Sequence, residues 1–420
     1  MRIALVHVAD QGGGAERSVL TLHQSLLAMG HECKLLVAKK LTDGEHIEQI
    51  ERIRPVPGVL RVTHFLEQRI GLQNLYAPWF RTLNGQIGDV DVLHLHSLWN
   101  EREGFADFRG LRLLSRRYPT VLTLRDGWML TGHCACPIGC DRWKTGCGRC
   151  PDLSRVPAIR TDTTWINWKR KQRALSVSPI QVTTVSHWLA GQVADSPLFK
   201  NKPVSVVHNS INENDFFPGC QKQARKALGI PQDLFVVMLA GQSIEWKAIG
   251  RSQHAVKALN ELKNPKIAAL LVGNQASKVA ESLTDCRSVI VPRQYKAAGM
   301  RVCYQAADVT VVTSEYETFG RVAAESVFCG TPVISFATGG LPEIVVPGIS
   351  GWLVPSNDRE YLRQIIGAVF EDRITLQEMR ATCANWAKQQ FSLRPICEQY
   401  LRVYENTIAR HRHLKGSGIA

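Results

Sequence analysis

The chain has 420 residues, too many for one ordinary hydrophobic core and enough for two α/β domains. Apolar residues make up 45% and charged residues 21%, a balance that excludes a disordered chain. The formal charge is +14, from 51 basic and 37 acidic side chains, and this excess favours anionic partners.

Several further classes of protein are disfavoured. Basic residues cluster at 169–173 and 402–415, but neither cluster is interleaved with aromatic residues as a single-strand binding surface would be. The first ten residues are typical of a β-strand, not of a cleavable signal peptide, and no segment has the composition of a transmembrane helix. We therefore expect a cytoplasmic protein without a nucleic-acid partner.

The first half of the chain alternates short β-branched runs with longer helical patterns, such as those at 16–29 and 104–117. This alternation predicts a doubly wound, parallel sheet. The predicted strands are 3–8, 34–38, 90–96, 120–125, 180–186 and 204–208.

A stretch dense in turn-forming residues at 209–218 then interrupts the pattern, and a second α/β series follows. Its predicted strands are 234–240, 267–272, 288–291, 309–313 and 332–336. We predict two Rossmann-like domains, 1–207 and 208–392, that face each other across a cleft. The last helical pattern, at about 393–420, is long enough to pack back on the first domain.

Glycines follow the first predicted strand, at Gly12, Gly13 and Gly14, and Glu16 comes directly after. Glycines at a strand-to-helix turn let a ligand approach the backbone closely. Further along, His94 and His96 share one face of a strand end. We expect His94 to be packed against the sheet, and for His96 both packing and contact with a substrate are open.

Five of the chain's 12 cysteines lie between residues 131 and 151. Cys134, Cys140, Cys147 and Cys150 can supply four thiolates, and the last two are separated by a two-residue gap that suits tetrahedral zinc. In a reducing cytosol a metal explains such a cluster better than disulfides do. The spacing matches no well-known zinc ribbon, so a structural zinc site and a cysteine-rich loop without metal are both open.

The most informative segment runs from Ser314 to Glu325. Glu317 lies in a turn after a predicted strand, and Phe319 and Gly320 open a helix that contains Glu325. The N–H groups at a helix start attract an anion such as a diphosphate. Two carboxylates beside that anion can accept hydrogen bonds from sugar and ribose hydroxyls.

This segment closely resembles the glutamate–seven–glutamate signature of family-4 glycosyltransferases, which have the fold called GT-B. The resemblance implies that Glu317 contacts the donor sugar and that Glu325 binds the nucleotide ribose. It also implies that Gly13 and Gly14 lie near the donor phosphate, with Glu16 on the acceptor side. In this family the stereochemistry is retained and catalysis needs no metal or other cofactor.

The segment 241–247 resembles the family's phosphate loop, with Lys247 in place as the phosphate-binding cation. Gln242 departs from the pattern because an arginine is common there. Arg321 and Arg293 are candidate substitutes for the missing cation.

The segment 123–128 resembles a Leu-His-Asp segment of relatives that build surface polysaccharides such as colanic acid. Arg125 stands in place of the histidine, and its pKa is too high for it to act as a base. It could stabilise the leaving phosphate, with Asp126 orienting the acceptor, or it could pair structurally with Asp126. Both interpretations are open.

The resemblance implies a hexosyltransferase that uses a nucleoside-diphosphate sugar and a lipid-linked or oligosaccharide acceptor, in surface polysaccharide synthesis at the inner face of the membrane. Two alternatives remain: a sugar-nucleotide epimerase on the same fold, and a non-catalytic subunit that binds sugar nucleotides. The nucleobase, the linkage and the oligomeric state do not follow from the sequence.

Overall fold

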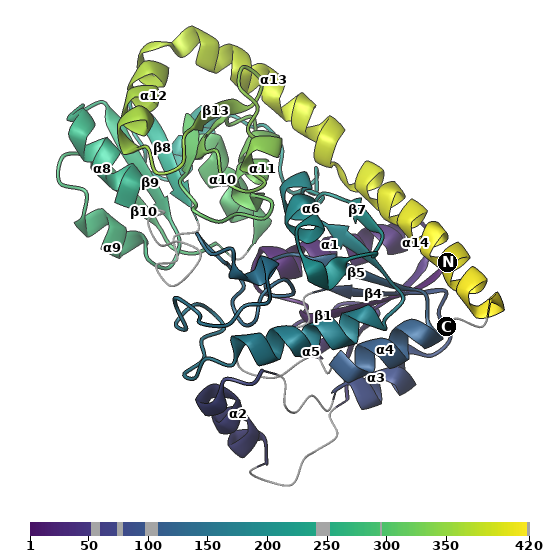
Figure 1. The fold of residues 1–420 in the computed structure, drawn as a ribbon. Coiled ribbons are helices and arrows are strands. Elements are labelled where there is room, and N and C mark those ends of the chain that lie inside the picture. The colour runs from purple at the N-terminus through teal and green to yellow at the C-terminus, as the bar shows by residue number, and fades with distance from the viewer. Residues whose placement is uncertain (52–58, 74–78, 97–107, 241–252, 295, 418–420) are drawn as a thin grey trace. The chain divides into compact units, whose positions relative to one another are not determined.

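The computed structural model describes residues 1–51, 59–73, 79–96, 108–240, 253–294 and 296–417. The chain divides into two compact units (Figure 1). The first contains Met1–His208 and Ile396–Ala420, and the second contains Asn209–Pro395. Among the described residues, no helix is both long and apolar enough to cross a bilayer.

The first unit is built on a parallel sheet of seven strands in the order β3-β2-β1-β4-β5-β6-β7. The strand order reverses between β1 and β4, so their carboxyl ends flank a switch point, where ligands of α/β sheets usually bind. The strands are β1 (Arg2–Ala9), β2 (Glu32–Lys39), β3 (Ile47–Gln49), β4 (Val92–His96), β5 (Thr120–Leu124), β6 (Ile180–Thr184) and β7 (Val204–Val206).

Helices cover this sheet, and the last helix of the chain belongs mostly to this unit. The core around Leu5 and Leu35 includes Tyr400 and Tyr404 of that last helix, drawn in yellow in Figure 1. The helices are α1 (Gly14–Ala28), α2 (Val59–Ile70), α3 (Trp79–Ile87), α4 (Phe108–Arg117), α5 (Thr164–Ser176), α6 (His187–Ala194) and α14 (Leu393–Gly416), with 3-10 turns η1 (Arg142–Lys144) and η2 (Pro197–Phe199).

The second unit contains a parallel sheet of six strands in the order β10-β9-β8-β11-β12-β13, with its switch point between β8 and β11. The strands are β8 (Phe235–Ala240), β9 (Ile267–Val272), β10 (Arg287–Val291), β11 (Val309–Val312), β12 (Val333–Phe336) and β13 (Gly351–Val354). The helices are α7 (Gln221–Ala227), α8 (Gln253–Leu262), α9 (Ala276–Glu281), α10 (Ala297–Ala306), α11 (Arg321–Phe328), α12 (Arg359–Glu371) and α13 (Arg373–Phe391), with the 3-10 turn η3 (Leu341–Glu343).

A buried ion pair anchors α7 to the sheet of the second unit. The Arg225 guanidinium donates to the Asp308 carboxylate, with 2.7 Å between Nη2 and Oδ2. The same carboxylate oxygen accepts the backbone N–H of Val236 at 2.6 Å. Arg225 also donates to backbone carbonyls, so its buried charge is both paired and hydrogen-bonded.

The predicted fold class, two doubly wound parallel-sheet domains, is confirmed. Two strands were not predicted, β3 and β13, and each forms an edge of its sheet. Of the helix predicted at 104–117, residues 108–117 form α4, and 104–107 lie outside the described residues.

Candidate active site

The segment with the two glutamates lies at the switch point of the second sheet, directly after β11. Gly320 precedes the first residue of α11 and has a φ of 103°, in the left-handed region that favours glycine. A Cβ atom there would approach Leu341 Cδ2 to 2.7 Å. The glycine therefore permits both the turn and the close contact from which α11 starts.

Glu325 lies in the second turn of α11, and its side chain is buried and fixed. Arg321, one turn earlier, donates its Nε–H to Oε1 at 2.7 Å, and the Tyr304 hydroxyl lies 3.1 Å from Oε2. Each carboxylate oxygen has two lone pairs. The site thus holds a pre-oriented carboxylate, a group that accepts hydrogen bonds from hydroxyl groups.

Glu317 is only partly buried, and its backbone is held by the turn after β12. Its carbonyl accepts the N–H of Gly340 at 2.8 Å. Gly339 has a φ of 62°, and a Cβ atom there would lie 1.8 Å from the Glu317 carbonyl oxygen. Phe319 packs edge-on against Phe391, with 5.7 Å between ring centroids. The backbone of Glu317 is therefore fixed, whereas its side chain is accessible.

The side chains considered for binding the diphosphate differ in where the structure places them. Gln242 and Lys247 lie outside the described residues. Arg293 is exposed at the end of the β10 segment. Arg321 forms the ion pair with Glu325, so its first role in this structure is to hold that carboxylate.

In the first unit, the glycine loop forms the start of α1 at the carboxyl end of β1. Gly13 and Gly14 are exposed at the start of the helix. The Glu16 carboxylate accepts the Gly13 N–H at 2.7 Å. Glu16 therefore caps the helix.

Arg125 follows β5 and is buried together with histidines of the neighbouring strands. Its Nη2 donates to Nδ1 of His96 at 3.3 Å. The His96 ring lies against His94, with 3.8 Å between centroids. The His94 ring is hydrogen-bonded to Tyr404 Oη at 2.7 Å and to Thr123 Oγ1 at 2.6 Å. These contacts agree with the prediction that His94 is packed against the sheet. His96 is fully buried as well, and it contacts Arg125 instead of solvent.

These histidines are neutral at ordinary pH. Burial lowers the pKa of His7, on β1, to about 4, although Glu16 opposes the shift. The 3.9 Å contact between His7 Nε2 and Glu16 Oε1 is therefore not an ion pair near neutral pH. Burial likewise holds the pKa values of His94 and His96 well below the ordinary histidine value. A neutral His96 accepts the N–H of Arg125 on Nδ1.

The segment after Arg125 is tied to α5 through a buried lysine. Asp126 accepts the N–H of Trp128 at 2.8 Å, which closes a tight turn. The Lys171 ammonium donates to the carbonyls of Trp128 and Thr131, the latter at 2.8 Å, and lies 3.7 Å from the centre of the Trp128 ring. Burial lowers the pKa of Lys171 to about 7. Asp126 is thus presented on a fixed backbone.

Comparisons with known proteins agree with this arrangement. Residues 12–215 match the family described as Glycosyltransferase Family 4, and residues 221–390 match the family described as Glycosyl transferases group 1. Sucrose-phosphate synthase from Thermosynechococcus elongatus superposes with a TM-score of 0.71 at 21% identity, over 97% of this chain and 99% of that one. The chain belongs to the GT-B glycosyltransferases.

Two further relatives indicate the range of substrates within similar proteins. Anabaena HepE, solved with UDP-glucose, has a TM-score of 0.67 at 18% identity, over 97% of this chain and all of that one. D-inositol 3-phosphate glycosyltransferase 1 from Catenulispora acidiphila is 32% identical over 222 residues, 49% of this chain and 52% of the relative. The chain thus matches about half the length of the curated relatives.

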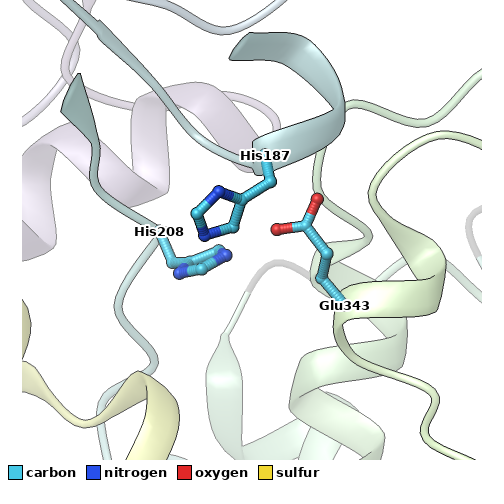
Figure 2. Close-up of side chains that lie close together, drawn as sticks. All are labelled: His187, His208 and Glu343. Atoms are coloured by element: carbon cyan, nitrogen blue, oxygen red, sulfur yellow. The ribbon is translucent and has the colours of Figure 1, made fainter. Parts of the chain in front are cut away.

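One pair of histidines in this GT-B chain was not singled out from the sequence. His187, the first residue of α6, and His208, after β7, follow adjacent parallel strands (Figure 2). Their ring centroids are 5.8 Å apart. Neighbouring parallel strands end at one edge of a sheet. The positions of the two histidines, three residues beyond β6 and two residues beyond β7, could therefore have indicated the pair. Figure 2 also shows Glu343 of η3, which belongs to the second unit.

The structure brings together the predicted residues within each unit. In the second unit, Glu317, Phe319, Gly320 and Glu325 surround the start of α11. In the first unit, the glycine loop with Glu16 lies at the end of β1, and His96, Arg125 and Asp126 lie at the ends of β4 and β5. The four predicted zinc ligands lie farther along the segment that begins with Arg125.

Proposed function

We propose that the chain transfers a hexosyl residue from a nucleoside-diphosphate sugar to an acceptor hydroxyl, with retention and without a catalytic metal. The observation that carries the proposal is the buried, pre-oriented Glu325 beside Glu317 at the switch point of the second sheet. The two family matches supply the reaction class.

On the donor side, we assign residues 208–392 to the nucleotide sugar. The Glu325 carboxylate would accept the ribose hydroxyls, and the partly exposed Glu317 would accept hydroxyls of the sugar. The backbone at Phe319 and Gly320, together with Lys247, would bind the diphosphate. HepE binds UDP-glucose, so a UDP-hexose is the first donor to test.

On the acceptor side, we assign residues 1–207 and the last helix. Arg125 is a hydrogen-bond donor that cannot remove a proton. In a retaining transfer the bond from C1 to the diphosphate breaks while the acceptor oxygen bonds to C1, and the acceptor proton passes to the leaving phosphate oxygen. Arg125 would stabilise the charge on that leaving group, and His96 would act behind it as a positioning residue.

The acceptor we propose is an anionic, lipid-linked saccharide at the inner face of the cytoplasmic membrane. The +14 charge supports an anionic partner. Helix α2 also exposes an apolar stripe, formed by Val62, Phe65, Leu66 and Ile70 at helical spacing, which suits a membrane surface. The relatives named for D-inositol 3-phosphate support a second candidate, a phosphorylated polyol acceptor.

Thermal-shift measurements against UDP-, GDP-, ADP- and dTDP-sugars would test the donor site. A donor at one hundred times its Kd adds about 2.7 kcal/mol to the free energy of unfolding. Glu325→Gln removes charge-assisted hydrogen bonds and is expected to weaken donor binding about 10- to 100-fold. Lys247→Ala should weaken it too. Exposed Glu378 and Lys257 provide matched controls, Glu378→Ala and Lys257→Ala.

Transfer assays with the identified donor would then separate the alternatives. Sugar transfer to a lipid-linked saccharide supports the proposal, and transfer to an inositol phosphate supports the second acceptor. Epimerisation of the donor without an acceptor would indicate the epimerase. Binding without turnover on any acceptor would indicate a sugar-nucleotide-binding subunit. The absence of any thermal shift would overturn the donor site.

A further inference from the structure

The connection between β5 and α5, residues 125–163, is unusually long for a compact domain. Its only regular element is the 3-10 turn η1. Trp128 and Trp143 are buried within it, but most of its polar contacts are local turns. A long segment with so little secondary structure needs a cross-link to hold one conformation.

Four cysteine side chains of this segment converge on one small cavity, with a volume of about 20 Å³. They are Cys134, Cys140, Cys147 and Cys150, and the imidazole of His133 also lines it. Cys136, in the same segment, does not. The volume suits a single ion, and thiolates are preferred ligands of zinc.

Most pairs among the four thiols interact electrostatically. Cys134 lies within range of the other three, and so does Cys140. Among the described residues, no three of these sulfur atoms lie within 4.8 Å of one another without a metal. Tetrahedral zinc, with Zn–S distances of about 2.3 Å, would therefore draw the sulfurs inward around the cavity.

The backbone around the last two cysteines has an unusual conformation. Gly146, Cys147, Gly148 and Arg149 all have positive φ, between 49° and 124°. For non-glycine residues this conformation is costly, so the surroundings must enforce it. The Gly132 N–H donates to Cys147 Sγ at 3.1 Å, a contact that stabilises a thiolate.

Neighbouring polar groups complete the surroundings of the cavity. The ammonium of Lys171 lies within electrostatic range of Cys147 and Cys134. Four thiolates around one Zn²⁺ carry a net charge of −2, which a buried cation offsets. His133 Nε2 lies 3.2 Å from Cys150 Sγ, and its Nδ1 lies 3.3 Å from the Pro157 carbonyl oxygen. His133 thus contacts one of the four cysteines without belonging to the set of four thiol ligands.

We propose that Cys134, Cys140, Cys147 and Cys150 bind one structural Zn²⁺ in a tetrahedral thiolate site. Each thiol loses its proton to solvent as its sulfur bonds to the ion. The site cross-links the segment whose first residues are Arg125 and Asp126. The Gly127 N–H donates to the Ala135 carbonyl at 2.8 Å, which connects the metal site to that turn.

Elemental analysis of the full chain, purified without a histidine tag or chelator, would test the site. We expect about one zinc per chain, and a drop to near zero in Cys147→Ser/Cys150→Ser. Cys136→Ala is the matched control and His133→Ala tests the ligand set. Both should keep the zinc. Loss of zinc in His133→Ala or Cys136→Ala, or retention of zinc in Cys147→Ser/Cys150→Ser, would overturn the assigned ligands.

A second set of measurements uses the wild-type chain, so it does not require the cysteine variants to fold. Chelation of the wild-type chain should lower Tm and expose four additional thiols to alkylation. Reconstitution with Co²⁺ should give the intense charge-transfer bands of a tetrahedral tetrathiolate. Wild-type chain without metal, bound iron, or a mass that shows disulfides in this segment would each overturn the proposal.

Discussion

In the second unit the buried guanidinium of Arg225 donates to the carboxylate of Asp308. In the first unit the buried ammonium of Lys171 donates to two backbone carbonyls, and Arg125 donates to a neutral histidine. Glu325, the carboxylate of the candidate active site, is also ion-paired, with Arg321. The second unit therefore holds these charges in pairs that fix geometry, whereas in the first unit these hydrogen bonds of Lys171 and Arg125 go to neutral groups.

Among substitutions of these buried groups, the largest expected loss of stability is in the second unit. Asp308→Asn leaves Arg225 as a buried charge without its carboxylate, and we expect a loss of about 3–5 kcal/mol in the free energy of unfolding. Urea denaturation measures it. Asp285→Asn, at an exposed position, is the control and should change stability little. A loss below about 1 kcal/mol would contradict the view that Asp308 compensates the buried charge of Arg225.

An acid-sensitivity test addresses the first unit. His7 has a pKa of about 4 in the folded chain and about 6.5 when unfolded, so the unfolded state binds more protons between these values. Its stabilising contribution is full above pH 6.5 and is lost as the pH falls toward 4. Between pH 7 and 5 we expect a loss of about 2 kcal/mol from this residue.

Hydrogen exchange at both pH values, corrected for intrinsic rates, would locate this loss. Peptides from β1 and β4 should lose protection in acid more than peptides from β8 and β11. His7→Gln should reduce the difference, because a side chain that does not titrate replaces the histidine. Equal loss in both units in the wild-type chain would contradict the prediction.

The smallest effect is expected at Lys171. Lys171→Met deletes the hydrogen bonds to the Trp128 and Thr131 carbonyls. We expect a cost of about 1–2 kcal/mol by urea denaturation, less than for Asp308→Asn. Lys200→Met, at an exposed position, is the control. A cost as large as that of Asp308→Asn would contradict the view that Lys171 stabilises this segment mainly through these two hydrogen bonds.

Much of the fold could be predicted because the strands of a parallel sheet are buried on both faces and appear as apolar runs. The two strands that were missed, β3 and β13, are short edge strands. β3 has exposed glutamate and glutamine residues. β13 begins at Gly351, whose Cβ would lie 1.8 Å from the Val333 carbonyl oxygen, so its pairing depends on a contact between distant segments.

The candidate site likewise has local features, which the sequence predicts, and features that depend on contacts between distant segments. The start of α11 with Glu317 and Glu325 is local, so sequence spacing was sufficient to predict it. The hydrogen bond between Arg125 and His96 depends on which strands are neighbours, and so does the pair His187 and His208. Strand order is set by packing across the whole sheet, which single-residue patterns do not encode. Arg321 was considered a phosphate ligand, although its i,i+4 spacing to Glu325 could have indicated the ion pair.

The position of α14 in the core of the first unit has a consequence for synthesis on the ribosome. Tyr400 and Tyr404 pack with β1 and β4, yet they are translated after the whole second unit. At about 5–20 residues per second, on the order of 10 s or more passes before they emerge. During that time the nascent first sheet lacks its last helix, and its apolar face is available to chaperones. A chain that stalls late in translation would therefore leave its first-made half unfinished.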